Sequence, residues 1–113
     1  MKLVLIFAAV AEAATGLALV IAPALVGELL LGESLVGVAI PVARVAGIAL
    51  LALGIACWPG PPILGMLTYG TLVTLYLAYL GYAGAGVLIW ATVIFHAILT
   101  ALLARDMLRK QRL

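Results

Sequence analysis

Four apolar stretches of about 20 residues follow one another along this sequence, and they constrain its fold more than any other feature. A helix of about 20 apolar residues is long enough to cross the hydrocarbon core of a bilayer. The chain is 68% hydrophobic and 9% charged, and a soluble domain of this length has too little interior to bury so much apolar surface. We therefore expect an integral membrane protein. Its predicted spans are residues 3–22, 37–58, 63–80 and 86–104.

The spans are expected to be helices, because they lack the alternating pattern of barrel strands and a lipid-exposed backbone must satisfy its own hydrogen bonds. Short connections favour antiparallel neighbours. The sequence thus predicts an all-α fold, an antiparallel four-helix bundle forming a single domain over residues 1–113. Residues 23–31 are too short to cross and predict a capped helix lying along the interface. Ser34 is expected to cap the second span, and Pro41 to bend it slightly.

The distribution of charge predicts the orientation of the chain. Lys2 flanks the first span, whereas the connection after that span holds Glu28 and Glu33. Basic residues concentrate on the cytoplasmic side of membrane proteins, so both termini are expected in the cytoplasm. The first span contains Glu12 and is followed by proline, which favours a retained helix over a cleaved signal peptide. The basic residues after the last span are Arg105, Arg109, Lys110 and Arg112.

Several classes of chemistry are disfavoured by the composition. A single cysteine, Cys57, excludes a disulfide or a CxxC pair within one chain. The net charge of +2 comes mainly from the C-terminal cluster, which indicates topology and not a nucleic-acid surface. No nucleophile–base pair, phosphate loop or complete metal shell stands out. We expect no catalytic residues, no metal and no nucleic-acid partner.

Three ionisable residues fall inside the predicted spans, namely Glu12, Arg44 and His96. Charged groups at membrane depth are costly and need a partner. One interpretation is a direct or water-bridged pair of Glu12 and Arg44 at the bundle centre. The other is that Arg44 reaches outward to the interface and Glu12 stays protonated. For a lone His96, a structural role is favoured over metal binding, since one His and one Glu supply too few ligands.

Polar side chains, most of them hydroxyl-bearing, form a polar face on each of the last two spans. Thr92, His96 and Thr100 repeat every four residues on the fourth span and can face the third. One interpretation is hydrogen bonding between helices that holds the bundle together. The other is a small polar cavity lined by Glu12, Tyr69, Thr71 and His96. The residues of the third-span face are Thr68, Tyr69, Thr71, Tyr76 and Tyr79.

The first half of the chain resembles small four-span bacterial membrane proteins of the DoxX-like type. The resemblance rests on Thr15-Gly16-Leu17, Ala22-Pro23, Leu30-Leu31-Gly32, Ala43-Arg44-Val45-Ala46-Gly47 and Ala52-Leu53-Gly54. It implies a four-helix bundle with an arginine in the second span, located in the bacterial inner membrane. Some relatives are attached to membrane redox or quinone-linked systems, but the group has no shared chemistry.

Glu12, within Ala11-Glu12-Ala13-Ala14-Thr15-Gly16, gives a second resemblance, to small multidrug-resistance transporters. In that family a first-helix glutamate exchanges protons for cationic substrates. Arg44 departs from the pattern, because its charge would repel a cation and compete for the carboxylate. The third span also lacks that family's glycine- and tryptophan-rich sequence.

The expected function is therefore a non-enzymatic bundle or accessory subunit with a buried polar centre that binds a small lipophilic ligand such as a quinone. The alternative is proton-coupled export of a small molecule through Glu12. No other cofactor is expected. The expected partners are the lipid bilayer and either a second copy of the chain or a larger membrane complex. The residues proposed for the polar centre are Glu12, Arg44, Tyr69, Thr71, Tyr76 and His96.

Overall fold

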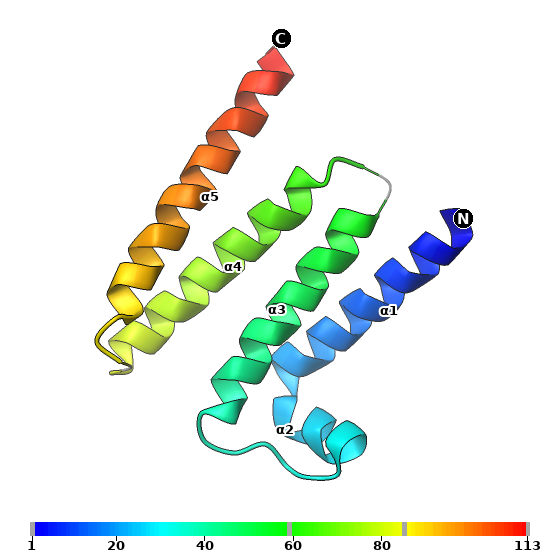
Figure 1. The fold of residues 1–113 in the computed structure, drawn as a ribbon, viewed down its shortest axis with the longest axis vertical. Coiled ribbons are helices and arrows are strands. Elements are labelled where there is room, and N and C mark those ends of the chain that lie inside the picture. Colours follow the sequence, from blue (N-terminus) through cyan, green and yellow to red (C-terminus); the bar gives the residue numbers. More distant parts are fainter. Residues whose placement is uncertain (1, 59, 85, 113) are drawn as a thin grey trace. The chain divides into compact units, whose positions relative to one another are not determined.

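The computed structural model describes residues 2–58, 60–84 and 86–112. These residues form helices joined by short loops, with no strand among them, so the predicted all-α class is confirmed. The chain divides into two compact units, Met1–Gly65 and Met66–Leu113. Each unit contains a pair of antiparallel helices (Figure 1).

Within the described residues, four helices are long and apolar enough to cross a membrane, in agreement with the four spans read from the sequence. The first and third begin and end within a few residues of the predicted limits. The fourth runs well past residue 104, so the basic C-terminal segment continues the last helix as far as Arg112. The helices are α1 (Lys2–Ile21), α3 (Ala39–Cys57), α4 (Ile63–Tyr82) and α5 (Ile89–Arg112).

In the first unit, α1 and α3 lie side by side with their backbones in contact (Figure 1). A Cβ atom added to Gly47 would lie 2.6 Å from the carbonyl oxygen of Gly16 and 2.8 Å from Cβ of Leu19. At Gly54 the added atom would lie 2.7 Å from the carbonyl oxygen of Ala9. Such distances leave no room for a side chain. The glycines therefore set the close approach of the two helices, as small residues do in membrane bundles.

The predicted short helix after the first span is present. It consists of α2 (Pro23–Val26) and a wide helical turn, η1 (Gly27–Leu31). Proline is well placed at the start of α2, because the first N–H groups of a helix have no helical partner. Gly32 ends the turn in the left-handed conformation, with φ of 85°, which is the usual way for a helix to stop.

The start of α3 differs from the prediction. Ser34 does not cap it, since the helix begins at Ala39 and no side chain bonds its first N–H groups. Instead, Gly37 adopts φ of 58°, and a hydrogen-bonded turn leads into the helix. Pro41 is consequently the third residue of α3, where its missing N–H removes no helical hydrogen bond.

In the second unit, α4 and α5 are antiparallel. Gly70 packs against the side chain of Thr100, and an added Cβ at Gly81 would lie 2.8 Å from the indole of Trp90. The contact near the end of α4 is thus made by the start of α5. The connection lies further along the chain than expected, because α4 continues through Tyr82 and α5 begins only at Ile89; within it Gly84 has a φ of 92°.

Large apolar side chains cover the outside of these helices. Phe7 on α1 is 77% exposed, and Ile94 on α5 is 58% exposed. Among the described residues the buried hydrophobic side chains are few, namely Ala9, Ile48, Ala52, Val73 and Val93. Exposed apolar surface of this extent is what lipid-facing helices require.

Candidate functional site

Arg44 is half-buried on α3 and reaches across to α1. Its Nε–H donates a hydrogen bond to the backbone carbonyl of Val20, at a distance of 3.2 Å. Val20 is the next-to-last residue of α1. The arginine therefore extends toward the start of its own helix, the direction in which helical side chains lean.

The carbonyl of Val20 needs such a donor. The last carbonyls of a helix have no partner within it, and Pro23 interrupts the chain two residues after α1 ends. Ala18 still accepts a bond from the N–H of Ala22, at 2.8 Å. A cation at this end also complements the negative pole of the helix dipole. Arg44 thus caps α1 from the neighbouring helix.

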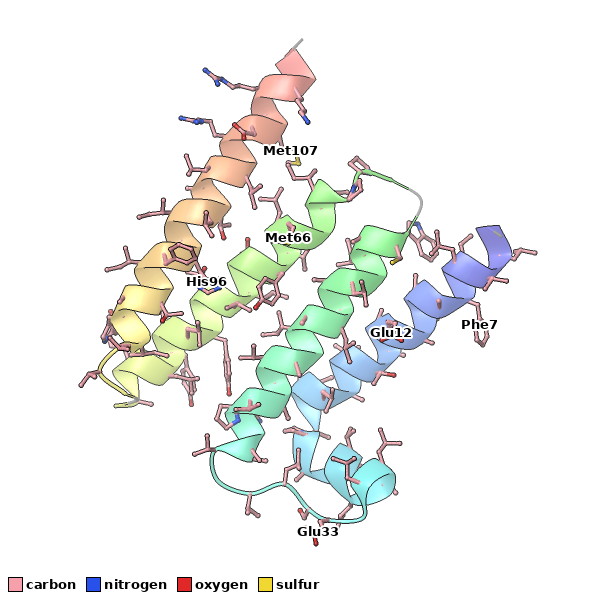
Figure 2. The ribbon with its side chains drawn as sticks, viewed as in Figure 1. Phe7, Glu12, Glu33, Met66, His96 and Met107 are labelled. Atoms are coloured by element: carbon pink, nitrogen blue, oxygen red, sulfur yellow. The ribbon has the colours of Figure 1, made fainter. Side chains whose placement is uncertain are left out.

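Glu12 lies halfway along α1 and is half-buried (Figure 2). Among the described residues it forms neither an ion pair nor a hydrogen bond. The direct Glu12–Arg44 pair, one of two open interpretations, is accordingly not formed. Eight residues, or about 12 Å of helix, separate Glu12 from the carbonyl that Arg44 binds. Both side chains lean toward their own N-termini, which carries them apart in an antiparallel pair.

The threonine hydroxyls of α5 bond to their own helix. Thr92 donates to the carbonyl of Leu88 at 3.0 Å, and Thr100 donates to the carbonyl of His96 at 2.7 Å. Bonds of this kind use the only O–H donor that a threonine has. For these two residues the predicted hydrogen bonding between helices is therefore wrong. Thr100 nevertheless faces α4, where it packs on Gly70.

His96 is held by the same helix. Its Nδ1 lies 3.0 Å from the carbonyl of Thr92. A carbonyl can only accept, so this contact requires the proton on Nδ1, and in that tautomer Nε2 is the acceptor nitrogen. His96 lies on the side of α5 that faces α4 (Figure 2). Its ring centroid is 6.3 Å from that of Tyr69 and 5.8 Å from that of Phe95.

Tyr69 and His96 are the two predicted site residues that the structure brings together. The hydroxyl of Tyr69 has no hydrogen-bond partner among the described residues. A phenol donor and an imidazole acceptor therefore stand next to each other between α4 and α5. Tyr76, by contrast, stacks on Tyr79 with ring centroids 6.2 Å apart.

Thr71 lies in a shallow groove between α4 and α5 of about 290 Å³. The same groove is lined by Thr74, whose hydroxyl oxygen is buried and has no partner within the described part of the chain. Sequence reasoning did not single out Thr74. Glu12 belongs to the first unit, whereas Thr71 belongs to the second. A cavity shared by Glu12 with Tyr69, Thr71 and His96 stays a prediction.

The first unit also contains a pocket that the sequence did not indicate. It has a volume of about 250 Å³ and is almost entirely apolar. Small residues that bring α1 and α3 together form one wall, and the chain after α3 forms the other. The sequence feature that could have indicated this pocket is the group of small residues near the proline-rich segment 58–62, which ends the second span. The lining residues are Ala9, Val10, Ala13, Gly54, Ile55, Trp58, Gly60, Pro61 and Leu64.

Within the described residues, no three His, Cys, Asp or Glu side chains come close enough to hold a metal ion. Comparison of the chain with protein-family models, with curated proteins and with solved structures finds no match. The function is therefore argued from the contacts of the side chains described above.

Proposed function

We propose that this chain is a non-enzymatic, multi-pass protein of the bacterial inner membrane that binds a small lipophilic ligand such as a quinone. The observation that supports the proposal is the Tyr69–His96 pair, with ring centroids 6.3 Å apart. A DoxX-like accessory role, with both termini in the cytoplasm, is part of the same proposal.

The hydrogen-bonding groups of the pair match the two redox states of a quinone. The hydroxyl of Tyr69 can donate to a quinone carbonyl, and Nε2 of His96 can accept from a quinol hydroxyl. Because Nδ1 is fixed by Thr92, the histidine offers its acceptor in one orientation. Apolar surroundings with a few fixed polar groups are typical of lipophilic ligand sites, and bundles place such ligands between helices.

Solvent extraction of the purified protein tests this function. We expect a quinone to co-purify with the wild-type chain. The amount of co-purified quinone per protein should fall several-fold in Tyr69→Phe and in His96→Gln. The matched control is Tyr79→Phe, because Tyr79 is 65% exposed on the same helix. Equal quinone content in all four proteins, or none in the wild type, would rule the proposal out.

The second candidate function is proton-coupled export, and one observation favours it. Arg44 donates a hydrogen bond to Val20, so the carboxyl of Glu12 is not held in an ion pair with it and is available to exchange a proton for a cationic substrate. Infrared spectroscopy in detergent would follow protonation of Glu12 against a Glu12→Gln baseline. Cation-induced proton release that is absent from Glu12→Gln supports export. A carboxyl that never changes protonation excludes it.

A further inference from the structure

Arg44 has more hydrogen-bond donors than its known partner uses. A guanidinium carries five N–H donors in a rigid plane. The Nε–H donates to the carbonyl of Val20, and no acceptor for the two terminal amino groups is found among the described residues. Fixing Nε also fixes the plane of the group, so the terminal fork has one defined direction.

Among the described residues, Arg44 forms no ion pair with a carboxylate of its own unit. The three carboxylates there are Glu12, Glu28 and Glu33, and none forms an ion pair with Arg44 within the described ranges. Glu12 lies about 12 Å from Val20, toward the start of α1, and the other two are exposed on the segment that follows α2. An unpaired charge within an apolar span is costly, so an anion from outside the chain would be stabilising.

The depth of Arg44 indicates where that anion comes from. The residue lies five positions after the start of α3 at Ala39, which is about 7.5 Å along the helix. A long basic side chain that leans toward the helix start spans such a distance and reaches the headgroup level. The guanidinium lies at the end of α1, next to the turn into α2. Phosphate groups of the lipid occupy this level of a bilayer.

We propose that Arg44 binds a phosphate oxyanion, and that the headgroup of a membrane phospholipid supplies it. The terminal fork of a guanidinium matches two oxygens of a phosphate, which gives short, charge-assisted hydrogen bonds. The acyl chains would lie against the exposed apolar surface of the same unit. This inference is independent of the quinone proposal, since it uses another unit and another chemistry.

The test is the thermal unfolding of the purified full-length chain in a mild detergent. Phosphatidylglycerol, diacylglycerol with the same acyl chains, and inorganic phosphate are added separately. We expect phosphatidylglycerol to raise the unfolding midpoint by on the order of 5 °C, and diacylglycerol to have little effect. The rise should be lost in Arg44→Gln, be reduced in Arg44→Lys, which keeps the charge but loses the fork, and persist in the matched control Arg105→Gln.

If inorganic phosphate alone stabilises the wild type and not Arg44→Gln, the oxyanion site is supported and its source is a soluble ion. Equal effects of phosphatidylglycerol and diacylglycerol, or a rise that persists in Arg44→Gln, would overturn the proposal. Should Arg44→Gln fail to fold, NMR of the wild type labelled with ¹⁵N-arginine tests whether the lipid binds at Arg44. The Nε–H signal that Arg44→Lys removes must shift with phosphatidylglycerol and not with diacylglycerol, and an unshifted signal contradicts the site.

Discussion

The side chain of Arg44 and the backbone carbonyl of Val20 connect α3 to the end of α1 through a hydrogen bond of 3.2 Å. The bond places the arginine at a helix terminus, about 12 Å from Glu12 along the helix axis. It explains how a charged residue is accommodated in the first unit without the acidic partner that its sequence position suggests.

Removing this bond should destabilise the protein. We expect Arg44→Met to lower the free energy of unfolding by about 1.5–3 kcal/mol, the usual contribution of a hydrogen bond to a charged group. Arg105→Met is the matched control, because that side chain is 62% exposed, and it should change stability by less than about 0.5 kcal/mol. Unfolding in mixed micelles measures both. Similar losses for the two variants would contradict the capping role.

Glu12 and Arg44 should contribute independently to stability. Separated residues without shared partners give additive effects within about 0.5 kcal/mol. A double-mutant cycle of Glu12→Gln and Arg44→Gln is therefore expected to show no coupling beyond this limit. A coupling energy of about 1 kcal/mol or more would instead mean that the two side chains form the pair absent from the structure.

The contact between α1 and α3 should not tolerate a side chain at Gly47. Gly47→Ala would bring Cβ to 2.6 Å from the carbonyl oxygen of Gly16, and backbone cannot move aside without separating the helices. We expect a loss of about 1–3 kcal/mol, as for other overpacked sites. Gly60→Ala is the control, because an added Cβ there meets nothing within 4 Å. If both variants unfold at the same midpoint, the helices do not pack this closely.

The contact between α4 and α5 allows a rescue experiment. A Cβ at Gly70 would overlap the hydroxyl of Thr100, so Gly70→Ala should lower the thermal unfolding midpoint. Thr100→Ala removes the obstructing oxygen together with a bond to its own helix. We expect the double variant to be more stable than Gly70→Ala alone. A double variant whose losses simply add would show that the two residues are not in contact.

The orientation of the chain can be measured by cysteine labelling in a Cys57→Ser background. Ser34 and Lys110 are exposed, so a cysteine at either position can react. Since basic residues stay in the cytoplasm, a membrane-impermeant reagent applied from outside should label position 34 and leave position 110 unlabelled. Labelling of position 34 only from the cytoplasmic side would reverse the predicted topology.

The sequence by itself determined the four spans and the short helix after the first. A span depends on the number of consecutive apolar residues relative to bilayer thickness, which is a local property. Pro23 and Gly32 likewise act locally, by removing a donor and by permitting a left-handed turn. The prediction that Ser34 caps α3 was wrong. A turn through Gly37 supplies the first hydrogen bonds of this helix without a side-chain cap.

Tertiary structure alone decided how the polar residues are used. Arg44 could pair with Glu12 or reach outward, and only the register of α1 against α3 shows that it meets Val20. Thr92 and Thr100 could bond across the bundle or within their own helix, and both bond within it. Tyr69 and His96 meet because α4 and α5 pack antiparallel. Span formation is local, whereas polar contacts depend on register between helices, which a strongly apolar sequence specifies only weakly.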